Sequence, residues 1–437
     1  MNEQPLFSLD RLRPSQQDVV TGYPGGRMGI SAVPGSGKTH TLSYLAADII
    51  LGGNLDLNQE VLIVTLVNTA VDNFSERIGR LIQSEGLLPG MGYRVRTLHG
   101  LAHDIVRERP GLVNLANDFS IIDEKEANRI REQVVLAWMR NNPGFFEAYL
   151  NPELSDYELA RVRTKQIPSL AQNLALNVIK YAKNYELTPA ELRRRLENLP
   201  APLPLAEMGC EVYEEYQRSL SYRGAVDFDD LIRLALAALR ADPGLAERLH
   251  YQWPYILEDE AQDSSRLQEE ILQILAGEDG HWVRVGDPNQ AIYETFTTAS
   301  PKHLIDFLNA PGVLRKELPV SGRSSRTIIH LANRLIDWTR QEHPNPEARD
   351  ALHLPHIQPT DPDDPQQNPP DDSGRIYFHV TRLTSEEELD LVVKSLIRWQ
   401  KNQDDLPEQE RETLVVLDYR NDRGTEVAEA LRKRGVE

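Results

Sequence analysis

The first 110 residues alternate short apolar runs with longer stretches in which apolar residues recur at helical spacing. Residues 28–33 (MGISAV) and 61–67 (VLIVTLV) are continuous apolar runs, a pattern that favours buried strands. A helical stretch follows each run, from Lys38 to Ile50 and from about Ala70 to Gln83. Strands that alternate with helices in this way predict a parallel sheet with crossover helices, which is an α/β fold.

From residue 111 to residue 220 the pattern changes, because strand-like runs become rare and long helical stretches replace them. Apolar strand patterns return at 255–259 (YILED) and 282–287 (WVRVGD). Strand patterns on both sides of a helical region indicate that the region is inserted into one sheet domain. We therefore predict a first α/β domain at 1–110 and 221–300, interrupted by a helical domain at 111–220.

A second α/β domain is predicted at 301–437. Strand patterns occur at 375–380 (RIYFHV) and 413–419 (TLVVLDY), and helical stretches follow them, the first from Ser385. Residues 343–374 are rich in Pro and Asp, and such a composition cannot build an apolar core. We expect a disordered surface loop there, with a partner-binding tail as the alternative.

The composition narrows the class of protein. An apolar share of 40% and a charged share of 26% are ordinary for a globular chain of 437 residues. No run of 18 apolar residues is present, and the first residues lack the pattern of a signal peptide. The single cysteine, Cys210, excludes an internal disulfide framework. We therefore expect a cytoplasmic protein with no membrane partner.

The net charge is −19, from 48 Lys and Arg residues against 67 Asp and Glu residues. This balance argues against a protein that bulk positive charge holds on nucleic acid. A local basic groove is compatible with it, because salt confines the field of a charge to about 8–10 Å. The function therefore has to be inferred from individual sites.

The sequence AVPGSGKT, from Ala32 to Thr39, has the Walker A pattern and lies between a predicted strand and a predicted helix. Its glycines allow the backbone to wrap around phosphate, and N–H groups at the start of a helix favour a bound anion. We expect Lys38 to reach the β- and γ-phosphates and the Thr39 hydroxyl to bind Mg²⁺. The residues expected around the nucleotide are Ala32, Pro34, Gly35, Ser36, Gly37, Lys38, Thr39 and His40.

Asp259 and Glu260 stand at the carboxyl end of an apolar strand, where ligands bind in open parallel sheets. We expect Asp259 to bind Mg²⁺, and Glu260 to orient and polarise the attacking water. A lone Asp-Glu pair is more often a solvated turn. The apolar strand and the Walker A sequence in the same chain favour catalysis instead, and together the two patterns predict a P-loop NTPase.

Seven segments of the chain resemble, in the same order, the motifs of the UvrD/PcrA/Rep group of superfamily 1 DNA helicases. Each segment is a weak signal alone, and their common order and spacing make the resemblance specific. The segments are 12–20 (LRPSQQDVV), 65–78 (TLVNTAVDNFSERI), 97–107 (TLHGLAHDIVR), 226–232 (VDFDDLI), 259–263 (DEAQD), 285–296 (VGDPNQAIYETF) and 322–325 (GRSS).

The resemblance implies two RecA-like motor domains with ATP and Mg²⁺ between them. The implied partner is single-stranded DNA, including junctions of single- and double-stranded DNA. The implied activity is that of an ATP-dependent DNA helicase or translocase that moves 3′ to 5′. The helical region at 111–220 would correspond to the first accessory domain of the family.

The resemblance also implies roles for single residues. Gln16 would contact the adenine edge, Gln290 would sense the γ-phosphate, and Arg323 would be an arginine finger. Without the resemblance, Arg323 would be interpreted as part of a surface ion pair. DNA contacts are implied for Thr65, Asn68, His99, Tyr293 and Phe296. Taken alone, the two aromatic residues in this set would be interpreted as packed core side chains.

Three positions depart from the family pattern. Leu66 stands where the family usually has a Phe that contacts a base, and Thr297-Thr298 stands where it has Arg-Gly. Gly322 stands where the family has a Tyr that stacks on adenine. We therefore expect the nucleobase selectivity to be loose.

Two later family motifs, V and VI, are not found before Glu437. We therefore expect an incomplete second motor domain and weak hydrolysis by this chain alone. The chain would be a fragment, one half of a split protein that a separate chain completes, or a degenerate copy. An ATP-binding regulatory subunit without turnover is the alternative function. A small-molecule phosphotransferase would share the Walker A sequence but leave the other motifs unexplained.

Overall fold

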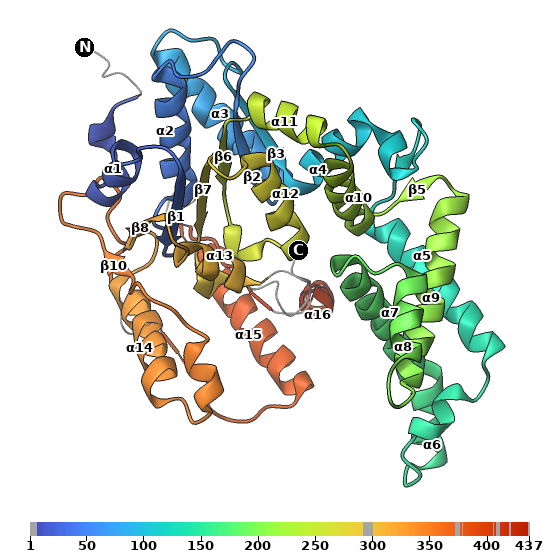
Figure 1. Cartoon of the computed structure of the whole chain (residues 1–437). Coiled ribbons are helices and arrows are strands. Elements are labelled where there is room, and N and C mark those ends of the chain that lie inside the picture. The colour runs from blue at the N-terminus through green and yellow to red at the C-terminus, as the bar shows by residue number, and fades with distance from the viewer. Residues whose placement is uncertain are drawn as a thin grey trace. The chain divides into compact units, whose positions relative to one another are not determined.

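A computed structural model describes residues 7–291, 300–371, 376–377, 379–404, 406–407, 411–418 and 421–435. The chain forms two compact units, Met1–Asp371 and Asp372–Glu437 (Figure 1). The first unit contains a central sheet and an inserted group of helices. The described residues of the second unit form two helices.

Six strands form one parallel sheet in the first unit (Figure 1). They are β1 (Arg27–Ala32), β2 (Val61–Thr65), β3 (Tyr93–Thr97), β6 (Tyr255–Glu258), β7 (His281–Gly286) and β8 (Leu314–Leu318). Their order in the sheet is β3-β2-β6-β7-β1-β8. Every neighbouring pair is parallel, so the carboxyl ends of all six strands lie at one edge. The predicted α/β class with a parallel sheet is confirmed.

Helices cover both faces of the sheet, because its inner strands are apolar on both sides. On β2, Val61 and Ile63 belong to the core on one face, and Leu62 and Val64 belong to the core on the other. The helices that contribute to these cores are α1 (Pro14–Thr21), α2 (Lys38–Leu51), α3 (Asn68–Ser84), α4 (Leu98–Glu108), α10 (Phe228–Ala241), α11 (Pro243–Gln252), α12 (Arg266–Ala276) and α13 (Pro301–Leu308).

The sheet extends beyond residue 300, where we expected the first domain to end. Strand β8 pairs with β1 in a register that runs from Met28 opposite Leu314 to Ala32 opposite Leu318. Its sequence, LRKEL, contains three charged residues and lacks the continuous apolar run of the inner strands. This composition suits an edge strand, which is half exposed. The division of the chain into domains stays a prediction.

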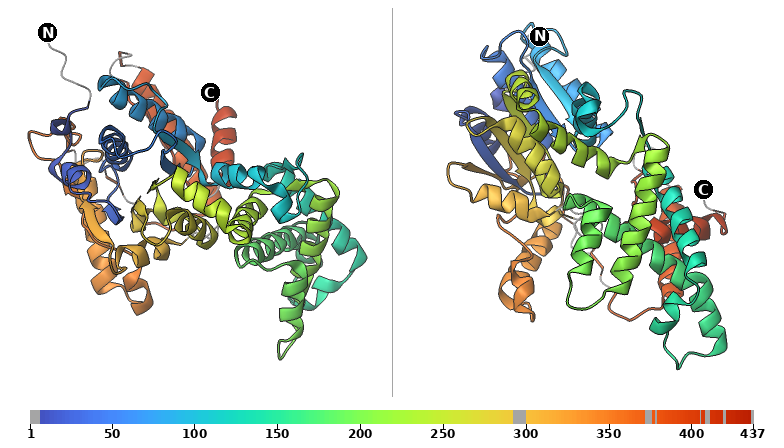
Figure 2. Two further views of the ribbon diagram at one scale, coloured as in Figure 1. Left: turned by 45° about the horizontal axis from the view of Figure 1, so that its top comes forward. Right: turned by 45° about the vertical axis from the view of Figure 1, so that its right-hand side comes forward.

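The region between residues 111 and 220 is mostly helical, as its sequence pattern predicts. Its helices pack around their own apolar core, and they form one bundle in both views of Figure 2. They are α5 (Glu124–Asn141), α6 (Asp156–Arg161), α7 (Ile167–Asn184), α8 (Pro189–Glu197) and α9 (Pro204–Tyr222). A short parallel pair, β4 (Ser120–Ile121) with β5 (Ala225–Val226), joins the two points at which the chain enters and leaves this region.

The remaining elements of the first unit are one long helix and several short segments. They are α14 (Arg326–Glu342), β9 (Val320–Ser321), β10 (Gln358–Pro359), η1 (Leu9–Arg11), η2 (Pro110–Val113), η3 (Phe145–Tyr149), η4 (Val162–Gln166), η5 (Ala261–Asp263), η6 (Pro288–Gln290) and η7 (Pro346–Asp350). None of the described helices combines the length and the apolar character that crossing a bilayer requires.

A buried lysine connects the inserted helices to α10. Lys183 of α7 is 1% exposed, and its Nζ donates to Asp227 Oδ2 at 2.6 Å and to Asp230 Oδ2 at 2.9 Å. The Tyr216 hydroxyl of α9 donates to the same oxygen of Asp227 at 2.8 Å. Burial alone would lower the pKa of Lys183, but the two carboxylates outweigh it and raise the pKa. The lysine is therefore charged, and it fixes α7 and α9 against the start of α10.

Residues 343–371, the described part of the Pro/Asp-rich segment, make contacts that their composition did not predict. The Asn333 side chain accepts from Ile357 N at 2.9 Å and donates to Ile357 O at 2.8 Å. His356 Nε2 lies 2.8 Å from Asp337 Oδ1, and β10 pairs in parallel with β9. Polar side chains of α14 thus bond to this segment and hold it without an apolar core.

The second unit contains α15 (Ser385–Asp404) and α16 (Asn421–Arg432), at the positions where helices are predicted. Arg423 of α16 donates to Ser385 O at 2.5 Å and pairs with Glu388 Oε2 at 3.0 Å, which joins the two helices. The strand expected at 413–419 is wrong in its described part, because residues 413–418 adopt no regular structure and the apolar side chains of residues 414–417 are exposed instead of being buried in a sheet. The strand expected at 375–380 includes residues outside the described part of the chain, so it stays a prediction.

We expect the substitution Lys183→Ala to lower the free energy of unfolding by about 3–5 kcal/mol, because it removes the ammonium that pairs with the buried Asp227 and Asp230, and the pairing of Asp230 with Arg233 offsets the loss only in part. Urea unfolding followed by circular dichroism measures the loss. Lys165→Ala removes an exposed lysine of the same region and should change stability by less than about 0.5 kcal/mol. Equal effects of the two substitutions would contradict the role of the buried network.

Candidate nucleotide-binding site

The Walker A sequence forms the turn between β1 and α2. Gly35 and Gly37 have φ angles of +76° and +83°, in the left-handed region that favours glycine. A Cβ on Gly35 would lie 2.5 Å from Arg323 Cβ and 2.6 Å from Ser321 Oγ. At Gly35 both the backbone conformation and the lack of space therefore exclude a side chain.

The carboxyl ends of β1 and β6 bring two distant motifs together. Lys38 Nζ lies 2.9 Å from Glu260 Oε2, and the Thr39 hydroxyl donates to Asp259 Oδ2 at 3.3 Å. The latter two residues are 220 positions apart in the chain. The structure therefore unites the Walker A residues with the acidic pair at one site, as a shared nucleotide requires.

Asp259 is a buried carboxyl whose charge is not fully compensated. Its Oδ1 is buried and has no hydrogen-bond partner. Burial and the neighbouring Glu260 raise the pKa of Asp259 to about 7, against the opposing effects of Lys38 and Thr39. A buried, unpaired carboxylate oxygen beside a threonine hydroxyl suits Mg²⁺, which prefers oxygen ligands.

The candidate magnesium site is not a closed protein cage. Among the described residues, no three His, Cys, Asp or Glu side chains cluster in a way that could hold a metal ion. Mg²⁺ in nucleotide sites usually takes one or two protein oxygens and completes its shell with phosphates and water. Thr39 and Asp259 fit that arrangement.

Gln262 joins the acidic pair to the following motif. Its Nε2 donates to Glu260 Oε2 at 2.9 Å, and its Oε1 accepts from Asp287 N at 3.1 Å. Gln290 Nε2 donates to Asp287 Oδ2 at 2.7 Å, which extends the chain of bonds. Glu260 has a φ of +55°, which is rare for a residue with a Cβ and indicates that its surroundings hold it. The sequence analysis assigned no role to Gln262 or Asp287, although both lie within the recognised motifs.

A buried ion pair joins β6 to β7 directly before the acidic pair in the sequence. The side chains of Arg284 on β7 and Glu258 on β6 are 0% and 1% exposed, and Arg284 Nε lies 2.7 Å from Glu258 Oε2. The Ser264 hydroxyl donates to Glu258 Oε1 at 2.6 Å, which ties the loop after Glu260 back to the sheet. The pair is not apparent from the sequence, because a charged residue within an apolar strand does not indicate its partner.

Gln16 and His40 lie at the P-loop turn and at the start of α2. Gln16 Nε2 donates to Ser36 O at 2.9 Å, and its Oε1 accepts from Arg13 N at 2.9 Å. The His40 ring lies 4.8 Å from the Tyr44 ring. Burial, together with nearby arginine side chains, lowers the pKa of His40 to about 4, so this imidazole is neutral at pH 7.

Arg323 lies beside the P-loop. Its Nε would be 3.4 Å from a Cβ built on Gly35. A guanidinium at this distance from the phosphate-binding backbone suits an arginine that acts on phosphate. The role of Arg323 as an arginine finger stays a prediction.

Three of the predicted DNA contacts lie where strands of the sheet end. Thr65 is the last residue of β2, Asn68 is the first of α3, and His99 is the second of α4, directly after β3. Asn68 is exposed and Thr65 is buried. The His99 ring lies 5.2 Å from the Phe228 ring, and burial lowers the pKa of His99. Asn68 is therefore accessible to a ligand, whereas Thr65 is covered.

Other predicted DNA contacts cannot be located. Tyr293 and Phe296 lie outside the described residues, as do Thr297 and Thr298. Leu66, which stands where the family has an aromatic residue, packs against the core that contains Leu62.

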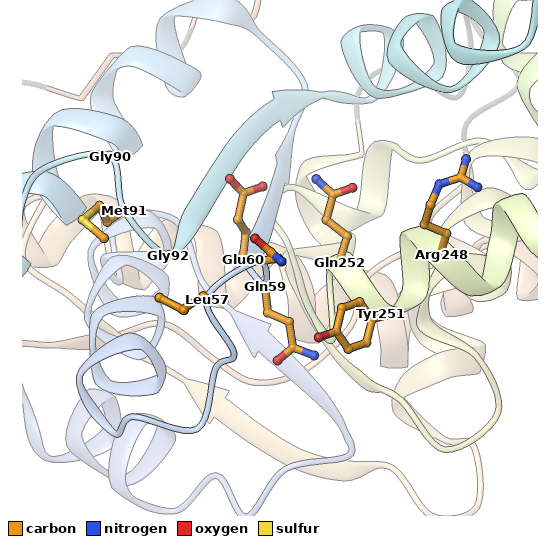
Figure 3. Close-up of a pocket in the computed structure, with 10 residues that line it drawn as sticks. Leu57, Gln59, Glu60, Gly90, Met91, Gly92, Arg248, Tyr251 and Gln252 are labelled. Atoms are coloured by element: carbon orange, nitrogen blue, oxygen red, sulfur yellow. The ribbon is translucent and has the colours of Figure 1, made fainter.

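A hollow of about 560 Å³ lies at the opposite edge of the sheet (Figure 3). Its lining includes Glu60 and Gly92, which precede β2 and β3, and Gln252, which ends α11 shortly before β6. These are the amino ends of the strands, whereas the Walker A turn and the acidic pair follow carboxyl ends. The hollow is therefore distinct from the candidate nucleotide site.

The profile described as UvrD/REP helicase N-terminal domain matches residues 12–311. The ATP-dependent DNA helicase PcrA of Leuconostoc citreum is 28% identical over 320 residues, which are 73% of this chain and 38% of that protein. DNA helicase II of Escherichia coli is 28% identical over 333 residues, 76% of this chain and 41% of that protein. The PcrA helicase of Staphylococcus aureus is 25% identical over 396 residues, 90% of this chain and 46% of that protein. The chain thus spans less than half the length of these relatives.

We expect Gly35→Ala to weaken binding of a nucleoside triphosphate by about tenfold or more, because the new methyl group would collide with Arg323 and Ser321. Isothermal titration calorimetry with Mg²⁺ and ATP measures the change. Gly53→Ala is the matched control, since Gly53 also has a positive φ, of +68°, but has open space around it. Equal losses in the two variants would show that backbone strain, and not the packed turn, is responsible.

Proposed function

Because this chain belongs to the UvrD/REP helicase family, we propose that it is the ATP-hydrolysing motor portion of an ATP-dependent DNA helicase. The proposal rests on the contacts between the two motifs, in which Lys38 lies 2.9 Å from Glu260 and Thr39 lies 3.3 Å from Asp259. These residue types, at the end of two parallel strands, are those that phosphoryl transfer to water requires.

In the proposed mechanism, Lys38 moves from Glu260 to the β- and γ-phosphates when a triphosphate binds. Glu260 is then free to accept a proton from the attacking water, while Gln262 keeps its carboxylate in place. Thr39 and Asp259 would hold Mg²⁺, which neutralises charge on the phosphate oxygens. Arg323 would stabilise the charge that develops on the transferred phosphoryl group.

Gln290 would report the state of the γ-phosphate to the DNA-binding surface. Its bond to Asp287, and the bonds of Gln262 to Asp287 and Glu260, support this role by linking it to the proposed base. A change in the position of the Glu260 carboxylate would then be transmitted to residue 291, where the segment predicted to bind DNA begins.

Single-stranded DNA is the proposed track, with movement from 3′ to 5′. Asn68 and His99 would bond to it at the carboxyl edge of the sheet, and the helices at 111–220 would contact an adjacent duplex at a junction. Tyr293 and Phe296 would complete the DNA surface, whereas Thr65 is buried and is not proposed as a direct contact. We further propose that robust unwinding needs a complete second motor region, whether the same chain or a separate one supplies it.

A nucleotide-binding regulator without turnover is the second candidate. Its support is the direct ion pair of Lys38 with Glu260, which ties up the proposed base until a ligand separates the two. Binding of ATP without hydrolysis, in the presence and in the absence of single-stranded DNA, would favour this candidate.

We expect Lys38→Ala to abolish ATP binding, and Glu260→Gln to retain binding but slow hydrolysis by about 10²–10⁴-fold, since it removes a general base. Phosphate release with and without single-stranded DNA measures both effects. Glu278→Gln alters an exposed glutamate and should behave as the wild type. Hydrolysis that is insensitive to DNA, or unchanged in Glu260→Gln, would reject the motor.

DNA binding should weaken steeply with salt despite the net charge of −19, because contacts to phosphates release counterions. For three or four such contacts to a single strand, we expect the logarithm of affinity to fall with a slope of about −2 to −3 against the logarithm of salt concentration. Fluorescence anisotropy of a labelled oligonucleotide provides the measurement. A flat response would contradict a local DNA-binding groove.

A further inference from the structure

Residues 358–368, here called the strap, run alongside the segment that contains Gly322 and Arg323. The strap begins with β10, which pairs with β9. Near its end, Asn368 Nδ2 donates to Ser321 O at 2.7 Å and to Ser324 O at 2.9 Å. The strap is thus bonded to backbone on both sides of the predicted arginine finger.

A nearly buried ion pair joins the strap to the start of the chain. Arg13 Nε lies 2.6 Å from Asp364 Oδ2, and the two side chains are 10% and 8% exposed. Arg13 Nη2 donates to Asp364 Oδ1 at 3.4 Å and to Gln366 Oε1 at 3.5 Å, and Nη1 donates to Val320 O at 3.3 Å. The hydrogen bonds of a guanidinium lie in its plane. These bonds therefore fix the plane of Arg13, and flat contacts to a ring can be made only through a face of that plane.

Arg13 is linked to the P-loop through Gln16. Its backbone N–H donates to Gln16, and Gln16 donates to Ser36 O. The γ-phosphate of a bound triphosphate would lie at Lys38 and Glu260. The nucleoside end would then emerge from the loop on the side of Gln16 and Arg13.

Gly322 has no room for a side chain, because the strap and Arg13 occupy that space. A Cβ built on Gly322 would collide with Gln366 O and would lie 2.9 Å from Arg13 Nη2. A residue with a side chain at position 322 would therefore have to displace the strap. A ligand on this side of the P-loop would meet Arg13 and Gln366 instead of a side chain at position 322.

We propose that Arg13, oriented by Asp364 and Gln366 of the strap, forms the nucleobase subsite and stacks one face of its guanidinium on the base. This inference rests on the proposed function, because it requires a nucleoside triphosphate at the P-loop. Planar arginine stacks well on aromatic rings, whereas lysine offers a point charge without a face. The subsite would thus recognise the base by stacking, and the phosphates would be recognised separately.

The test compares ATP with inorganic tripolyphosphate, which carries the phosphates but no base. Dissociation constants are measured by calorimetry with Mg²⁺ on the full chain. We expect Arg13→Ala to weaken ATP roughly 3- to 30-fold and tripolyphosphate less than twofold. Arg13→Lys should resemble Arg13→Ala for ATP, because it restores the charge without the plane. Asp364→Asn keeps Arg13 but loosens its orientation, and it should weaken ATP alone.

Arg315→Ala is the matched control, since it removes an ion-paired arginine from β8 and should leave both constants unchanged. Circular dichroism shows that each variant is folded. Equal weakening of both ligands in Arg13→Ala, or wild-type ATP affinity in Arg13→Lys, would overturn the nucleobase subsite while leaving the P-loop intact. A wild-type chain that binds neither ligand would instead reject the proposed function itself.

Discussion

The parallel pairing of β1, β7 and β6 is the constraint on which the candidate site depends. Because the three strands run in one direction, the segments that follow them meet at one edge of the sheet. This convergence also concentrates acidic groups, and burial raises the pKa of both Asp259 and Asp287. Lys38 supplies the main positive charge that compensates these carboxylates. A site that holds excess negative charge in this way is suited to a magnesium-bound anion.

Two buried ion pairs serve as rigid supports around this edge. Arg284 with Glu258 lies within the sheet, behind the acidic pair, and Lys183 with Asp227 and Asp230 joins the inserted helices to α10. Burying such charges costs solvation free energy that their attraction roughly offsets, so their net contribution to stability is small. Their larger effect is on geometry, because a displaced partner would leave an unpaired charge in the interior.

The candidate nucleotide site is assembled from segments that are far apart in the sequence. Residues 13–16, the P-loop, the Gly322 segment and the strap all meet there through hydrogen bonds to backbone or buried side chains. The composition of the strap predicts disorder, but its polar side chains bond to the backbone of β9 and to the side chain of Arg13. In the sequence, Gly322 is a departure from the family pattern, which has a Tyr at this position. In the structure, the strap fills the space that a side chain at position 322 would need, so that glycine fits there.

The sequence by itself determined the parallel α/β sheet, the helical insertion and the membership in the helicase family. Apolar periodicity reports burial directly, and the Walker A and DEAQD residues are contiguous, so no fold is needed to recognise them. Only the tertiary structure decided that Gln262 and Asp287 link the motifs, that Arg284 pairs with Glu258, and that the strap meets Arg13. These contacts join residues from separate elements, and their partners depend on strand order and chain packing, which local patterns do not encode.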